Sequence, residues 1–122
     1  MKTLLLFSIL ILAATFAQAD TCSTIYVMLD NAETNLTRAS EENSLDVATN
    51  YARQSQEHLD NAAMAAVRCE CPMASMEFDT AASNAKRASE ASDSSDFINY
   101  LDKSIDSYNK GIDILDICPA TR

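Results

Sequence analysis

The chain has 122 residues, a length that fits one small domain, and its 18 acidic and 9 basic residues give a formal net charge of −9. An acidic surface of this kind repels nucleic acid and anionic lipid, so both are excluded as partners. The single glycine also excludes Gly-rich phosphate-binding loops.

Residues 1–19 have the pattern of a secretory signal peptide. Lys2 gives a positive start, residues 4–14 are apolar, and an A-x-A cleavage site follows at 17–19. The apolar run is shorter than the roughly 20 residues that a membrane-spanning helix needs, which disfavours the alternative of an uncleaved membrane anchor. We therefore expect a single mature domain, 20–122, that is secreted or periplasmic and has no membrane contact after cleavage.

Apolar and small residues recur at alternating steps of three and four along the mature chain, which predicts four helices packed at a shallow angle. The four sets are Cys22, Ile25, Leu29, Ala32, Leu36 and Ala39; Leu45, Ala48, Ala52, Ser55, Leu59, Ala62, Ala66 and Cys69; Cys71, Ala74, Phe78, Ala81, Ala85 and Ala88; and Phe97, Leu101, Ser104, Tyr108, Gly111, Leu115 and Cys118. Pro72 suits the first turn of the third helix, and Pro119 ends the fourth. The connections near 41–44 and 91–95 are short, so the predicted fold class is all-α, an up-down-up-down four-helix bundle.

Two halves of the chain resemble each other. The segments 22–69 and 71–118 both begin and end with cysteine, and they align without a gap after a shift of 49 positions. Of the 48 aligned residues 12 are identical, and four of these are consecutive, 38–41 against 87–90. Self-similarity at a fixed offset indicates an internal duplication. We therefore expect the bundle to consist of two duplicated helical hairpins.

The direction of the four predicted helices brings all four cysteines to one end of the bundle. Four cysteines in an exported chain imply two disulfides. A bridge between Cys69 and Cys71 is disfavoured, because disulfide geometry would strain so small a ring. We predict instead that Cys22 pairs with Cys69 and Cys71 with Cys118, so that each repeat is closed by its own disulfide. On the chain-entropy account each bridge stabilises the fold by roughly 4 kcal/mol.

The predicted core is asymmetric. The second and third helices present mostly alanine at their seam, whereas the fourth helix brings large residues: Phe97, Ile98, Leu101, Ile105, Tyr108, Ile112 and Leu115. Small residues opposite large ones can fill the interior by volume complementarity alone. Alternatively, the alanine walls leave room for a small apolar ligand between these helices.

Residues that could carry chemistry are few. His58 is the only histidine, so a multi-histidine metal site is excluded, and we expect a surface or half-buried structural role for it. The mature chain has four methionines, each within about two turns of a cysteine: Met28, Met64, Met73 and Met76. Together with the segment 69–71 they could form a soft Cu(I) site. The methionines do not follow the repeat and disulfides would consume the thiolates, so packing is the preferred interpretation.

The sequence therefore predicts an exported, acidic, non-catalytic helical module that binds or interacts with a partner. That partner is an unidentified protein or a small apolar ligand. The alternatives are a Cu(I) carrier that uses the methionine and cysteine end, and a carrier of small apolar molecules. We expect no cofactor and no enzymatic activity. Asn35 begins an Asn-Leu-Thr sequon, which matters only in a eukaryotic setting.

Overall fold

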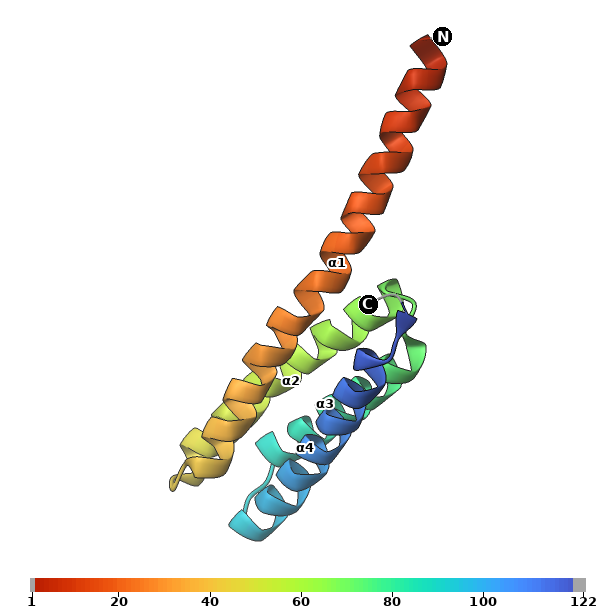
Figure 1. The fold of residues 1–122 in the computed structure, drawn as a ribbon. Coiled ribbons are helices and arrows are strands. Elements are labelled where there is room, and N and C mark those ends of the chain that lie inside the picture. Colours follow the sequence, from red (N-terminus) through yellow and green to blue (C-terminus); the bar gives the residue numbers. More distant parts are fainter. Residues whose placement is uncertain (1, 120–122) are drawn as a thin grey trace.

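A computed structural model of the chain describes the backbone of residues 2–119 and the side chains of residues 22–119. It contains four helices, α1 (Lys2–Glu41), α2 (Leu45–Arg68), α3 (Pro72–Ser89) and α4 (Ser94–Asp116), and the described part of the chain has no strand. Each helix runs antiparallel to the one before it, and the α1–α2 hairpin lies beside the α3–α4 hairpin (Figure 1). The predicted fold class is confirmed. The predicted signal peptide lies outside the residues whose side chains are described.

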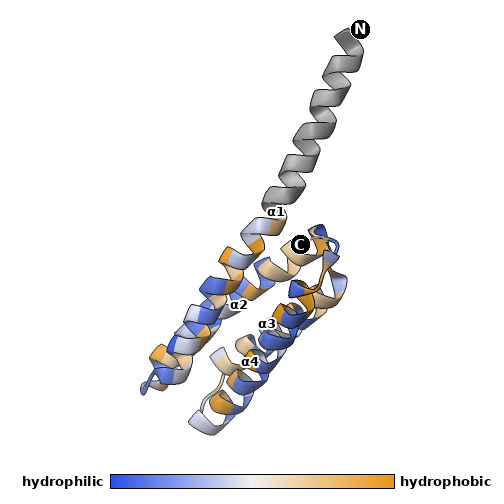
Figure 2. Cartoon of the chain, viewed as in Figure 1, coloured by the Kyte–Doolittle hydropathy of each residue, from blue (hydrophilic) through white to orange (hydrophobic). Residues whose placement is uncertain are grey.

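The alternating spacing of three and four residues marks the buried face of each helix, as predicted. Figure 2 shows hydrophobic and hydrophilic residues mixed within the turns of each helix, because each helix presents only one stripe to the interior. The most deeply buried large side chains are Phe78, Ile25, Leu29, Leu59 and Leu115. Burial of such a side chain contributes about 1.5–3 kcal/mol, so this stripe is the main source of stability.

Both predicted disulfides are confirmed. Cys22 is bonded to Cys69 with 5.3 Å between their Cα atoms, and Cys71 is bonded to Cys118 with 6.2 Å. Each bridge joins the open end of one hairpin, and both lie at the same end of the bundle because the α2–α3 turn separates Cys69 from Cys71 by one residue. Two disulfides in so small a protein indicate an oxidising environment, such as the extracellular space or the periplasm.

The α2–α3 turn is built around Glu70. Its φ of 60° lies in the left-handed region, which side chains other than glycine adopt at a cost. The amide of Glu70 donates to the Val67 carbonyl at 3.0 Å, and the amide of Cys71 donates to the Ala66 carbonyl at 2.9 Å. This is the Schellman arrangement that satisfies the last carbonyls of a helix. It reverses the chain between Arg68, where α2 ends, and Pro72, where α3 begins, and holds α2 close to α3.

The sequence repeat is accompanied by a repeat of contacts, each recurring 49 residues later. Ser55 Oγ donates to the Ala32 carbonyl, and Ser104 Oγ donates to the Ala81 carbonyl. The guanidinium of Arg38 lies over the Tyr51 ring, and that of Arg87 over the Tyr100 ring. The two halves therefore use the same contacts within each hairpin. Duplication as their origin stays a prediction.

At one place in the core the two halves differ by a pair of substitutions that compensate each other in size. Phe78 in the second half stands where the first half has Leu29, and Gly111 stands where the first half has Ala62. A Cβ on Gly111 would lie 2.7 Å from Cδ1 and 3.0 Å from Cζ of the fully buried Phe78 ring. The larger ring is accommodated because the facing helix has no side chain at this point.

Candidate functional site

The four seams of the bundle differ in width. Helices α1 and α2, α2 and α3, and α3 and α4 pack along their lengths, whereas α1 and α4 touch at few points. Two pockets of about 280 and 240 Å³ lie on this loose seam. Both are lined in part by Ser40, so the two pockets adjoin at this residue and form a two-part depression. We call it the α1–α4 groove.

The closed α2–α3 seam is packed through small residues. Ser75 Oγ on α3 donates to the Ala63 carbonyl on α2 at 2.8 Å, which requires the two helices to lie close together. At the repeat-equivalent positions the α1–α4 seam has Tyr26 and Ile112. These larger side chains keep α1 and α4 further apart, and no short turn ties this pair together. The two pockets described above lie at the seam with the large residues, and a pocket between the alanine-faced helices stays a prediction.

Two tyrosines close the α1–α4 seam toward the disulfide end. Tyr26 donates to Asp116 Oδ1 at 3.3 Å. Tyr108, which is 7% exposed, is within 3.4 Å of the Leu29 carbonyl and 3.3 Å of Glu33 Oε2. The groove thus begins at Tyr108 and continues toward the opposite, loop end of the bundle.

Burial of Tyr108 has a consequence at alkaline pH. Burial, followed by the nearby carboxylates of Glu33 and Asp30, raises the pKa of this phenol above its ordinary value of 10.0. The unfolded chain releases the proton near that ordinary value and the folded chain keeps it. The contribution of the Tyr108 phenol to the free energy of unfolding is therefore fully present below about pH 10. It is lost as the pH rises toward the higher pKa of the folded state.

We expect the free energy of unfolding of Tyr108→Phe to change less with alkaline pH than that of the wild type. The measurement is the free energy of unfolding in urea between about pH 8 and pH 11, where a tyrosine with an ordinary pKa titrates. Tyr100→Phe serves as the control, since Tyr100 is only half-buried, and it should leave the slope close to that of the wild type. Equal slopes for the wild type and Tyr108→Phe would contradict the role of Tyr108.

The floor of the groove is apolar. It is formed by Leu36, Ala39 and Leu45 on one side and by Phe97, Ile98 and Leu101 on the other. The prediction that Ile98 belongs to the core is wrong, because 55% of it is exposed. Helix α1 touches α4 at few points and leaves Ile98 uncovered. Ile105 and Ile112, which follow at intervals of seven, are half-buried for the same reason.

The edge of the groove is acidic. Glu33, Glu42 and Asp102 line the two pockets with exposed carboxylates, and no lysine or arginine is among the residues that line them. We call these three residues the acidic rim. Carboxylates of one sign over a low-dielectric floor create a negative potential that attracts cations.

The loop end of the groove is ordered by hydrogen bonds to the backbone. Glu42 Oε1 accepts from the amides of Asn43 and Ser44 at 3.1 and 3.2 Å, which holds the α1–α2 loop. Asp93 caps α4 by accepting from the amide of Asp96 at 2.9 Å. Both loops that flank the groove are therefore fixed by side chains, so the depression is preformed.

The other candidate residues do not line this groove. His58 is half-buried on α2, as expected. Met28 is half-buried and packs against the core, but Met64, Met73 and Met76 are 55–63% exposed, so packing is the wrong interpretation for these three. No cysteine of the described part is free, which removes the thiolate ligands from the Cu(I) hypothesis. Copper binding by the thioethers alone stays a prediction.

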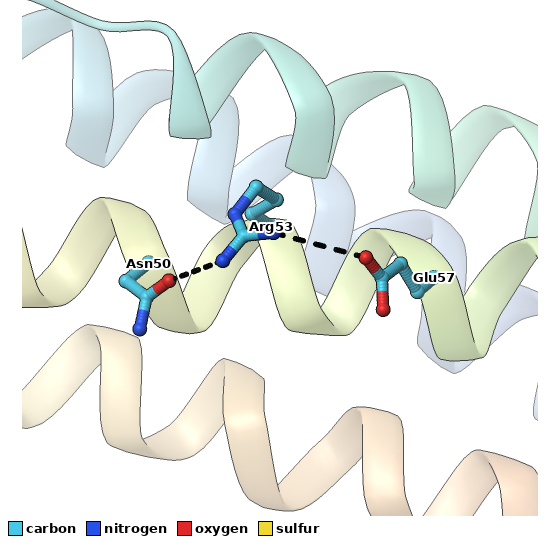
Figure 3. A network of polar contacts seen from close by, with 3 residues as sticks. All are labelled: Asn50, Arg53 and Glu57. Atoms are coloured by element: carbon cyan, nitrogen blue, oxygen red, sulfur yellow. Dashed lines mark hydrogen bonds and ion pairs between the residues drawn. The ribbon is translucent and has the colours of Figure 1, made fainter.

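Elsewhere on residues 22–119, polar side chains make local surface contacts. Figure 3 shows Asn50, Arg53 and Glu57 in a row along α2, where Arg53 donates to Asn50 Oδ1 at 2.6 Å and lies 3.8 Å from Glu57 Oε1. Such an exposed pair contributes little to stability. Within residues 22–119 no three His, Cys, Asp or Glu side chains are grouped to hold a metal ion.

Comparison of the chain with protein-family models, curated proteins and solved structures finds no match. In the part of the chain open to this test, no helix combines the length and the apolar character that crossing a membrane requires.

Proposed function

We propose that the protein is an exported, non-catalytic binding module and that the α1–α4 groove is its ligand site. One observation carries this proposal: the seam that should close the bundle leaves its apolar floor uncovered, next to an acidic rim. A concave apolar surface with a few polar groups at its edge is the usual form of a binding site. Export is supported by the pattern of residues 1–19 and by the two disulfides.

A non-catalytic role is supported by the chemistry of the groove. Its polar lining consists of exposed carboxylates, amides and hydroxyls, together with the phenol of Tyr108. That phenol already shares its hydrogen bonds with the Leu29 carbonyl and Glu33, and burial keeps it protonated. Such a set can recognise and orient a ligand, but it offers no activated nucleophile next to a base.

The test blocks the groove without altering the core. Ser40 is exposed and lines both pockets, so Ser40→Trp should fill the depression at its middle. Ser89 is its repeat equivalent and makes the same local hydrogen bond, to the carbonyl three residues before it, but it does not line the groove. Ser89→Trp is therefore the matched control.

Nile red, a neutral apolar dye whose fluorescence rises in apolar surroundings, is the probe. We expect the wild type and Ser89→Trp to bind it with similar affinity, and Ser40→Trp to bind it about tenfold more weakly. Circular dichroism should show unchanged helicity in both variants. Equal dye binding by all three proteins, or none by the wild type, would overturn the groove as the ligand site.

A further inference from the structure

Resting on the proposed function, we propose that the natural occupant of the α1–α4 groove is a basic amphipathic helix of a partner protein. The charge of the site is the first argument. The acidic rim of Glu33, Glu42 and Asp102 lies beside the apolar floor, and no cationic side chain lines either pocket. An occupant that buries an apolar stripe here would place its flanking residues against these carboxylates. Lysine and arginine on both sides of the stripe complement them.

The length of the groove is the second argument. Its lining residues extend from Glu33 to Ser40 on α1 and from Ser94 to Asn109 on α4, and the α1–α2 loop adds Glu42 and Asn43. At 1.5 Å per residue these helical stretches are about 10 and 22 Å long, which corresponds to roughly two to four helical turns. An elongated partner matches this shape better than a compact small molecule.

The division of the floor into two pockets is the third argument. Judged from the lining residues of the two helices, the pocket centres are about 5 Å apart along α1 and about 13 Å apart along α4. On a helix, side chains four or seven positions apart are separated by about 6 or 10 Å along the axis. Two apolar anchors at such a spacing can therefore enter both pockets together, as in other cases of helix-in-groove recognition.

A second copy of this chain is a poorer occupant. Without residues 1–19, which include Lys2, 8 basic and 18 acidic residues remain, a net charge of −10. Two such surfaces repel each other, and the acidic rim would face acidic helices. The charge of the whole molecule and the local charge of the groove thus favour a cationic partner.

The experiment distinguishes the effect of the acidic rim on binding from the effect of the protein's overall negative charge. The rim variant combines Glu33→Gln, Glu42→Gln and Asp102→Asn. The control variant carries the same changes away from the groove: Glu57→Gln, Glu77→Gln and Asp79→Asn. Both lose three negative charges, and glutamine at position 42 keeps an acceptor for the loop amides.

The probe is a labelled peptide of about 18 residues, long enough for a helix, built from leucine, alanine and lysine with leucines at helical spacing. We expect it to bind the wild type and the control variant within about twofold, and the rim variant about tenfold more weakly, at roughly 0.15 M salt. A peptide of the same composition without an apolar face should also bind about tenfold more weakly.

The outcomes distinguish this inference from the proposed function. Equal losses in the rim and control variants would show non-specific charge attraction and would overturn the helix proposal. So would rim-dependent binding of dodecylamine without rim-dependent binding of the peptide, which would assign the groove to a small cationic amphiphile. In both cases, weaker Nile red binding by Ser40→Trp than by the wild type would still support the proposed function. If Ser40→Trp bound Nile red as tightly as the wild type, the groove itself would be excluded as the ligand site.

Discussion

Removing the Cys71–Cys118 disulfide, by Cys71→Ala together with Cys118→Ala, is expected to lower the free energy of unfolding by about 4 kcal/mol. The bridge closes a ring over a sequence separation of 47, and opening it restores the freedom of that segment in the unfolded chain. Because small domains are stable by only about 5–15 kcal/mol, a loss of this size is a large share of the total.

The first half provides an internal comparison for this prediction. Its bridge spans the same sequence separation of 47, so Cys22→Ala with Cys69→Ala should cost about as much. Urea denaturation of both variants, beside the oxidised and reduced wild type, measures the two losses. If either variant lost less than about 1 kcal/mol, ring closure would not be a main source of stability in that hairpin.

Gly111→Ala is expected to destabilise the protein by about 1–3 kcal/mol, the usual cost of overfilling a core. Helix propensity alone predicts the opposite sign, because alanine is better than glycine in a helix by about 1 kcal/mol. The decisive difference is the Phe78 ring, which is fully buried and would lie too close to the added methyl group. Thermal melts of the single variant measure which effect is larger.

The compensating change makes this prediction sharper. Combining Gly111→Ala with Phe78→Leu recreates the pair that the first half has in Ala62 and Leu29. We expect the double variant to lose less free energy of unfolding than the two single variants lose together. The coupling energy in a double-mutant cycle should be about 0.5–3 kcal/mol. Additive losses would mean that the ring and the helix do not compete for the same space.

Much of the fold could be predicted from residue spacing. The steps of three and four located the buried stripe of each helix, and the equal cysteine spacing identified the disulfide pairing. Both features follow from the chain alone, since a helix repeats every 3.6 residues and a short loop reverses its direction. The left-handed backbone at Glu70 carried no such signal, because a glycine would have been expected there.

The groove could not be located in the same way, because the width of a seam depends on pairs of residues across it. Alanine-rich helices were expected to leave a pocket, yet their small side chains brought α2 and α3 together. The signal that was available is the second apolar stripe on α4, Ile98, Ile105 and Ile112. Three isoleucines beside an already complete heptad stripe indicate a face that needs a further neighbour.

The position of Glu70 between the two disulfides determines how the molecule responds to proteolytic cleavage of its backbone. Residues 22–69 and 71–118 are each closed into a covalent ring by a disulfide. One cut in the α1–α2 loop or in the α3–α4 loop therefore leaves a single molecule until the disulfides are reduced. Only the two peptide bonds of Glu70 lie between the rings. Proteolysis there would leave two separately cross-linked hairpins with no covalent bond between them, so this residue alone joins the halves as one polymer.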